Sequence, residues 1–290
     1  MGIQWYPGHM AKAKRMIQDN LKLVDVIIEL VDARIPFSSK NPDIDNLANN
    51  KSRIILLNKY DMADDKITDE WKEYYQDKGF FVSLINSKSG QGVKQVKNLV
   101  AQACKEKLEA NRRKGIINRP MRAMIVGIPN VGKSTFINSF VGRASAKTGN
   151  RPGVTKGKQW IRLSKEIELL DTPGILWPKI ANDFTGLALA FIGSVNDNII
   201  QMVDLSLDLI IFLSKNYPDS LVNRYDIEIP KDVDNHKEAA KHLEAIGLKR
   251  GCIIKGGQVD FERAANILLD DFRNARLGKI SLERPSTIFK

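Results

Sequence analysis

The chain has 290 residues and a formal net charge of +11, and 43% of its residues are hydrophobic and 27% charged. These fractions are typical of a folded globular protein and argue against disorder, and at about 100–200 residues per domain the length predicts two domains. The first ten residues lack the basic and apolar regions of a secretory signal, and no apolar run is long enough to cross a bilayer, so we expect a soluble, unexported protein without membrane contact.

The first third of the chain predicts strands that alternate with helices. Residues 24–31 and 53–57 are continuous apolar runs with polar residues after them, which is typical of strands buried in a parallel sheet. We expect a helix over 68–78, a strand over 80–85 and one long helix over 92–109. This alternation predicts βαβ units.

A basic stretch at 105–122 follows, with no sustained apolar face, and we interpret it as the junction between two halves of the fold. Beyond it we expect a strand over 123–127 and a helix over 133–141. Two further strands, over 160–163 and 167–170, form a plausible hairpin.

The pattern then changes, because apolar residues recur at helical spacing over 199–213, 239–246 and 261–272. We therefore predict an α/β domain at residues 1–178 and a separate all-helical domain at residues 179–290.

A glycine-rich loop lies between the strand at 123–127 and the helix that follows it. It reads Gly127-Ile128-Pro129-Asn130-Val131-Gly132-Lys133-Ser134, the phosphate-loop pattern. In this context backbone N–H groups wrap the phosphates, Lys133 meets the terminal phosphate oxygens, and the Ser134 hydroxyl binds Mg²⁺. The helix dipole also favours anions at that end. A chance glycine loop is the alternative. The predicted nucleotide contacts are Asn130, Val131, Gly132, Lys133, Ser134 and Thr135.

A guanine-reading motif, Asn-Lys-Tyr-Asp, occupies residues 58–61 after a predicted strand. The Asp61 carboxylate can accept from the N1–H and the exocyclic amine of guanine, two donors that adenine does not present together. A similar segment, Asn-Ser-Lys, follows the next strand and resembles the loop whose backbone N–H faces the base carbonyl. The alternative for the tetrapeptide is a solvated turn. The predicted guanine contacts are Asn58, Lys59, Asp61, Asn86 and Ser87.

A third motif, Asp171-Thr172-Pro173-Gly174, closes the last predicted strand. Asp171 supplies a carboxylate near Mg²⁺, and the Gly174 N–H can sense the γ-phosphate. Thr155, in a polar segment between the phosphate loop and Asp171, is the candidate that completes the metal shell in the GTP state. We therefore predict GTP or GDP as the ligand, with Mg²⁺ held by Ser134, Thr155 and Asp171 together with nucleotide and water oxygens. An ordinary turn and an exposed threonine are the alternatives.

The order of these motifs is inverted, because the guanine motif precedes the phosphate loop whereas most nucleotide switches have it afterwards. We therefore predict an α/β, circularly permuted P-loop GTPase domain with a mostly parallel sheet. Three further strings accompany the inversion: Trp5-Tyr6-Pro7-Gly8-His9-Met10, Asp32-Ala33-Arg34-x-Pro36 and Gly278-Lys279-Ile280. With them the chain resembles the circularly permuted GTPases of ribosome assembly over nearly its whole length.

The resemblance implies a cytoplasmic GTPase that binds a late precursor of the large ribosomal subunit and its rRNA. GTP binding and hydrolysis would act there as a maturation and release switch. The surplus of positive charge suits an RNA partner, although such charge often serves solubility alone. A GTP-dependent RNA-binding or RNA-modification factor that does not act on the large subunit is the alternative. Nothing in the sequence demands a dimer, and we expect a monomer.

Two expectations concern the reaction. Ras-type GTPases carry a water-orienting glutamine just after their third motif, but here the residue is Ile175. We therefore expect hydrolysis to be slow for the protein alone and stimulated by the ribosomal particle. The resemblance points to His9 as the catalytic group, with a structural or RNA-facing histidine as the alternative. Asn130 resembles the asparagine with which related GTPases hold K⁺, and its alternative is a residue that tolerates a tight turn.

Overall fold

The structure is a computed structural model. It describes residues 15, 17–48, 51–116, 119–142, 159–172, 183–197, 200–228 and 233–289. The chain divides into two compact units, the first made of Met1–Thr185 with Ser281–Lys290 and the second of Gly186–Ile280. The expected boundary at residues 178 and 179 falls outside the described ranges. Residues 281–290, which we assigned to the helical domain from the sequence, group with the first unit. None of the described helices is long and apolar enough to cross a membrane.

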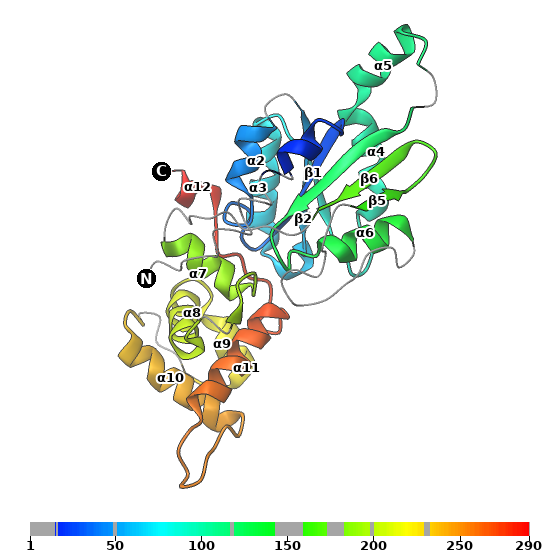
Figure 1. The fold of residues 1–290 in the computed structure, drawn as a ribbon. Coiled ribbons are helices and arrows are strands. Elements are labelled where there is room, and N and C mark those ends of the chain that lie inside the picture. The colour runs from blue at the N-terminus through cyan, green and yellow to red at the C-terminus, as the bar shows by residue number, and fades with distance from the viewer. Residues whose placement is uncertain are drawn as a thin grey trace. The chain divides into compact units, whose positions relative to one another are not determined.

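A six-stranded sheet forms the centre of the first unit (Figure 1). Its strands lie in the order β3 (Phe81–Ile85), β2 (Ser52–Asn58), β1 (Val26–Asp32), β4 (Met121–Gly127), β6 (Ile167–Asp171) and β5 (Gln159–Arg162). The first five are parallel, and β5 is antiparallel to β6. The expected mostly parallel sheet is confirmed, and each strand begins and ends within two residues of its predicted range.

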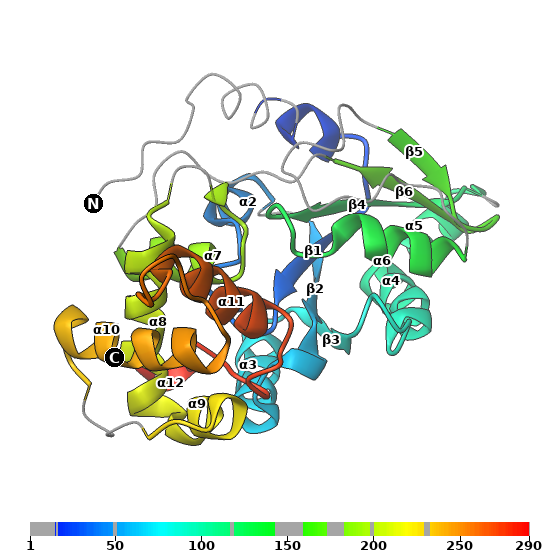
Figure 2. The same ribbon diagram turned by 90° about the horizontal axis from the view of Figure 1, so that it is seen from below.

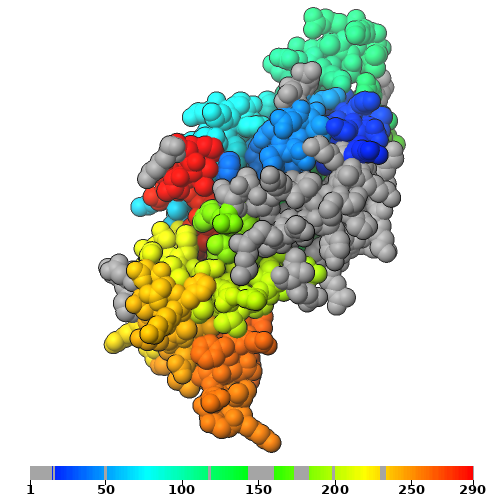
Figure 3. Space-filling model, turned by 60° about the vertical axis from the view of Figure 1, so that its left-hand side comes forward, coloured from blue at the N-terminus to red at the C-terminus, as the bar shows by residue number. Residues whose placement is uncertain are grey.

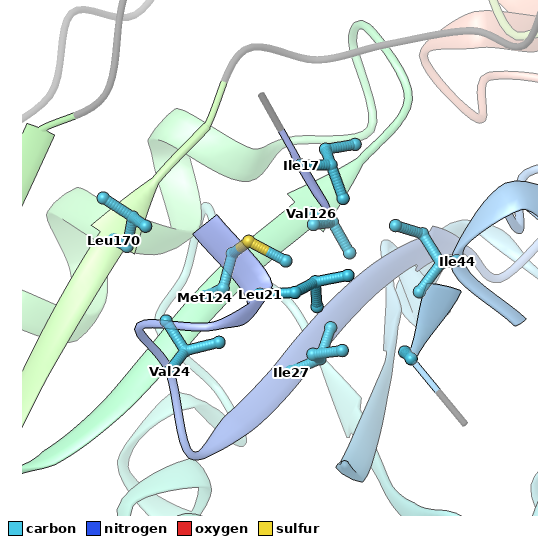
Figure 4. Packing of buried hydrophobic residues seen from close by; sticks show 9 residues of the cluster. Ile17, Leu21, Val24, Ile27, Ile44, Met124, Val126 and Leu170 are labelled. Atoms are coloured by element: carbon cyan, nitrogen blue, oxygen red, sulfur yellow. The ribbon is translucent and has the colours of Figure 1, made fainter. Parts of the chain in front are cut away.

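One face of the sheet carries a cluster of buried aliphatic side chains (Figure 4). Alternate residues of β1, β4 and β6 point into it, because side chains alternate between the two faces of a strand. The helix α2 (Pro42–Leu47), which we did not predict, covers part of this face. Its start is encoded by Asn41, whose side chain accepts from the Asp43 N–H at 2.9 Å, and by a proline in the first turn. The cluster comprises Ile17, Leu21, Val24, Ile27, Ile44, Ala48, Met124, Val126 and Leu170.

The same face continues over β2 and β3, where α3 (Asp65–Asp77) packs. Asp64 caps this helix by accepting from the Ile67 N–H at 3.1 Å. Trp71 and Tyr75 stack with ring centroids 5.6 Å apart and are both buried. The other helices that pack on the sheet are α4 (Val96–Ala103) and α6 (Lys133–Val141), which contact β2–β4 and β4 respectively (Figure 2).

The single long helix expected over 92–109 is wrong. The structure has a short 3-10 turn, η2 (Val93–Gln95), then α4, then a separate helix α5 (Lys105–Arg113), with the break at Cys104. The reason is the end of the apolar face: α4 buries three residues and Cys104 is 3% exposed, whereas no residue of α5 is buried. The basic α5 therefore stands out from the sheet at the surface (Figures 1 and 3).

The second unit is helical in its described part, as expected. The helix α7 (Asp183–Phe191) leads into it, and α8 (Met202–Asn216) packs against α9 (Pro218–Tyr225), α10 (His236–Lys249) and α11 (Phe261–Arg273). Asp271 is buried at 2% exposure and accepts from Arg224 and from the Tyr225 hydroxyl. After this unit the chain continues as residues 281–289, which include α12 (Pro285–Ile288).

Candidate functional site

The polar motifs meet at one edge of the sheet. In the register of the parallel strands, Asp32 at the end of β1 faces Asn58 at the end of β2, and Leu30 of β1 faces Gly127 of β4. Asp171 ends β6 on the other side of β4. The carboxyl edge of an open parallel sheet is where α/β proteins bind ligands, so the fold gathers the predicted motifs where a ligand site is expected.

The phosphate loop bends tightly between β4 and α6. A Cβ on Gly127 would lie 2.9 Å from the Leu30 carbonyl oxygen, so only glycine fits there. Asn130 has φ 59° and Gly132 has φ 99°, both in the left-handed region that asparagine and glycine tolerate. The loop thus leads to the first residue of α6, Lys133, and the N–H groups in the first turn of a helix are suited to bind an anion.

Asn58 joins three segments that are far apart in sequence. Its Nδ2 donates to the Val131 carbonyl at 2.7 Å, and its Oδ1 accepts from the backbone N–H of Ser87 at 3.0 Å and from the Ser87 hydroxyl at 2.8 Å. The Asn58 side chain is 1% exposed. A single buried amide therefore holds the phosphate loop, the guanine motif and the 86–88 segment together.

Lys59 makes a second connection across the site. It adopts φ 60° at the start of the 3-10 turn η1 (Tyr60–Met62), and its Nζ donates to the Asn130 carbonyl at 3.0 Å. The same Nζ lies 2.9 Å from Oδ2 of Asp32, which is fully buried. Burial lowers the pKa of Lys59 and the charge of Asp32 opposes that shift. At Asp32, burial is outweighed by the charges of Arg34 and Lys59, which hold the pKa of this carboxyl well below its usual value.

Asp61 presents an acceptor that no described residue satisfies. Its Oδ1 is buried and has no hydrogen-bond donor among the residues that the structure describes. A buried acceptor without a partner costs about 1–3 kcal/mol, and such atoms are rare in folded proteins. The N1–H and the exocyclic amine of guanine are the donors that would satisfy this carboxylate, so the observation fits a guanine ligand.

The 86–88 segment is a tight turn. Oδ1 of Asn86 accepts from the backbone N–H groups of Lys88 and Ser89 at 2.9 and 3.0 Å, and Asn86 also forms an isolated bridge with Gln91. Ser87 is buried against Asn58 at 4% exposure. The turn is therefore fixed on both sides and presents its backbone at the carboxyl end of β3.

The comparisons with known proteins agree with this geometry. A family model described as 50S ribosome-binding GTPase matches residues 122–244, which begin at β4 and leave out the guanine motif upstream. A ribosome biogenesis GTPase A from Bacillus cereus is 47% identical over 286 residues, 98% of this chain and 95% of the relative. The chain belongs to the ribosome biogenesis GTPase A family.

Two further matches also cover nearly the whole of this chain. A ribosome biogenesis GTPase A from Bacillus licheniformis is 46% identical and covers 98% of this chain and 99% of its own. A crystal structure of GNP-bound YlqF from T. maritima has a TM-score of 0.64 and 30% identity, and the match covers 94% of this chain and 98% of that one. The family likeness and the strand order together confirm the permuted P-loop GTPase fold.

The side of the site that the sequence predicts to bind Mg²⁺ centres on an ion pair. Nζ of Lys133 pairs with Oδ1 of Asp171, and these two side chains are 6% and 1% exposed. Ser134 follows in the first turn of α6 with its side chain half-buried. Within the described ranges no group of three or more His, Cys, Asp or Glu side chains is placed to hold a metal. A hydroxyl and a carboxylate suit Mg²⁺, which takes its remaining oxygens from nucleotide and water.

Three predicted site residues lie outside the described residues: His9, Thr155 and Gly174. The structure brings the others to the carboxyl edge of the sheet, at the ends of β2 and β6, on the loops that follow β2, β3 and β4, and in the first turn of α6. Sequence reasoning missed Asp32 and Arg34 as part of this site. The signal was a polar Asp-Ala-Arg string directly after a buried strand, which we noted only as a mark of resemblance.

Proposed function

We propose that this protein binds GTP and GDP with Mg²⁺ and hydrolyses GTP as a cytoplasmic assembly factor of the large ribosomal subunit. The observation that carries the nucleotide assignment is the junction at Asn58, which ties the phosphate loop to the guanine-reading loop, beside an Asp61 oxygen that lacks a donor. The family membership supports the role in ribosome assembly. The description of the matching family model supports the large subunit as the partner.

On this proposal the base and the phosphates bind at opposite ends of the site. Asp61 accepts from guanine and Lys59 covers its ring, while the Asn86–Ser87 turn offers backbone N–H groups to the base carbonyl. The phosphates lie on the backbone N–H groups of Asn130 to Thr135 and on Lys133. Lys133, which pairs with Asp171 in the structure, would contact the phosphate oxygens, and Ser134, Thr155 and Asp171 would hold Mg²⁺, which would neutralise phosphate charge.

Hydrolysis on this proposal needs groups from outside the observed site. Ile175 occupies the place of the water-orienting glutamine, so the protein alone is slow and the ribosomal particle stimulates it. His9 is the proposed catalytic residue, which acts when the protein is bound to the particle. Gly174 senses the γ-phosphate through its N–H. A K⁺ ion beside Asn130 would add a fixed positive charge next to the phosphates, although φ 59° also gives this asparagine a role in the turn.

The proposed partner is a late precursor of the large subunit, contacted through its rRNA by a monomeric protein. Positive charge supports this, because α5 carries Arg112 and Arg113 on a helix with no buried residue. Trp160 is 38% exposed with the Arg122 guanidinium 5.1 Å from its ring, an arrangement suited to stacking on a base. Phe272 is only 2% exposed and belongs to the core of the second unit.

The test compares GTP hydrolysis by the full-length protein alone, with purified large-subunit precursors, and with small subunits as the matched control. We expect turnover to rise only with the large-subunit particle, and bound protein to leave that particle when GTP is hydrolysed. Equal turnover under all three conditions would contradict the proposed switch. A His9→Ala variant that keeps full stimulation would remove His9 from the reaction, and equal rates in Na⁺ and K⁺ buffers would remove the K⁺ site.

A further inference from the structure

The loop that follows β1 connects to the guanine motif through a buried ion pair. This loop, residues 33–40, is called the Arg34 loop below. Arg34 is 1% exposed, and its Nε and Nη2 bind the two oxygens of Asp32 at 2.9 and 2.8 Å. Oδ2 of Asp32 also lies 2.9 Å from Nζ of Lys59. Because the bidentate contact fixes the plane of the carboxylate, the place of Lys59 depends on the Arg34 loop.

The end of the chain binds the same loop. Residues 281–289 are called the C-terminal segment below. The Leu282 N–H donates to the Arg34 carbonyl at 2.8 Å, and the Glu283 carboxylate accepts from the N–H groups of Phe37 and Ser38 at 2.8 and 3.1 Å. Glu283 is 2% exposed, and its own carbonyl accepts from Nε1 of Trp71 at 2.9 Å. Because the Glu283 carboxylate is almost fully buried, these backbone donors replace the hydrogen bonds that it would otherwise make with water.

The C-terminal segment also meets the chain just beyond the guanine motif. Oγ of Ser281 accepts from the Asp64 N–H at 3.1 Å, three residues after Asp61. Asp64 in turn caps α3, the helix that follows the turn η1 that carries Asp61. The C-terminal segment therefore contacts the chain near both side chains assigned to guanine. It bonds Asp64, close to Asp61, and it bonds Arg34, whose partner Asp32 pairs with Lys59.

Both covalent connections to the helical unit lie at or beside residues that bond to this loop, Thr185 on one side and Leu282 on the other. Thr185 is the last residue of the first unit before the helical residues, and its Oγ1 accepts from the Ser38 hydroxyl at 3.2 Å. Ser281 is the first residue after them and begins the C-terminal segment. A movement of Thr185 or of residues 281–282 would therefore change contacts of the Arg34 loop within the first unit.

We propose that Asp32, Arg34 and Glu283 are positioning residues for the guanine nucleotide, and that the C-terminal segment sets nucleotide affinity by holding the Arg34 loop behind Lys59. The inference rests on the proposed assignment of guanine to Lys59 and Asp61. It adds a direction of control, because whatever loosens the C-terminal segment also loosens Lys59. By linkage the reverse holds as well, and a bound nucleotide tightens the segment.

The test measures GDP and IDP affinities of the full-length protein by calorimetry. Glu283→Ala should weaken both nucleotides by a similar factor of about ten, since Lys59 covers the ring and does not read the exocyclic amine that IDP lacks. The matched control is Arg284→Ala, whose half-exposed side chain pairs with Glu70 at the surface at 3.5 Å. The control should stay within about twofold of the unchanged protein. A folded Glu283→Ala variant with unchanged GDP affinity would overturn the inference.

A second measurement needs no variant. GDP should slow hydrogen exchange at the amides of Leu282, Phe37 and Ser38, with the Leu163 amide in the β5–β6 turn as reference for general stabilisation. A purely structural segment would show no change beyond that reference, and this result would also overturn the inference. Asp61→Ala, measured in parallel, separates the two assignments: retained GDP affinity there refutes the guanine site itself, whereas loss there with no response of the segment refutes only the coupling.

Discussion

Replacing Asn58 by alanine tests whether one buried amide holds the nucleotide site together. The change removes the donor to the Val131 carbonyl and the acceptor for the Ser87 N–H and hydroxyl. Val131 and Ser87 are 0% and 4% exposed, so water does not readily replace the lost partner. The hydroxyl of Ser87 can rotate toward another acceptor, but the two backbone groups cannot.

The magnitude follows from those two backbone groups. An unsatisfied buried donor or acceptor costs about 1–3 kcal/mol, so Asn58→Ala should lower the free energy of unfolding by about 3 kcal/mol. GDP affinity should fall at least about tenfold, because a misalignment costing about 1.4 kcal/mol in binding already gives that factor. Urea unfolding and calorimetric titration with GDP measure the two effects separately.

Asn86→Ala is the matched control for stability. The Asn86 side chain also accepts from two backbone amides, those of Lys88 and Ser89, but these hydrogen bonds are exposed to water. Water replaces the lost acceptor there, and the unfolding free energy should fall by less than about 1 kcal/mol. Equal losses in the two variants, or an Asn58→Ala protein with unchanged stability and GDP affinity, would refute the argument that burial makes Asn58 the junction of the site.

Three further predictions concern single groups. Gly132→Ala should abolish tight GDP binding in a nucleotide titration, because φ is 99° and the new Cβ would lie 2.4 Å from Nδ2 of Asn58; normal affinity would contradict this geometry. Asp61→Asn should lower GDP affinity and raise XDP affinity, because an amide can donate to the xanthine oxygen; competition between the two nucleotides measures the ratio. Burial raises the pKa of Glu283 to about 7 against the opposing hydrogen bonds of Ser38. The folded state therefore binds an extra proton between the unfolded pKa of about 4.5 and about 7, and this contribution, up to about 3 kcal/mol, is lost as pH rises through that window. Urea unfolding should show that the stability of Glu283→Gln, relative to the unchanged protein, rises from pH 5 to 7.5, and a constant difference would contradict the shift.

Much of the nucleotide site was predictable because its geometry follows from the sheet. Apolar runs such as 53–57 identify parallel strands, and the carboxyl ends of parallel strands meet at one edge. Asn58 and Asp171 had to lie at that edge once their strands were identified. The tight bend of the phosphate loop was also predictable, because Gly132 occupies a left-handed position at the start of α6 that favours glycine.

The supports of the site were not predictable in the same way. The bonds between Glu283 and the Arg34 loop join residues 245 and 246 positions apart, and no periodicity or spacing encodes such a contact. A glutamate at this position also reads as a surface residue from its chemistry alone, whereas it is 2% exposed. The break at Cys104 was not predicted for a related reason. Helix propensity continues through Cys104, and only the end of the sheet beneath α4 ends the buried packing of this helix.

Circular permutation changes which strands the chain joins directly, and it leaves the contacts between neighbouring strands unchanged. The strand β1 still lies between β2 and β4, and the guanine motif follows β2 whereas the phosphate loop follows β4. What the inverted order adds is the place of the helical unit in the chain. It follows β6, the strand that ends in Asp171 on the phosphate side, and it is followed by the C-terminal segment, which binds the Arg34 loop on the guanine side. In an unpermuted chain the same strands would be joined by loops, and no domain would stand between β6 and the segment that binds the Arg34 loop. Both ends of this insertion contact the Arg34 loop, because Thr185 accepts from Ser38 and the Leu282 N–H donates to the Arg34 carbonyl.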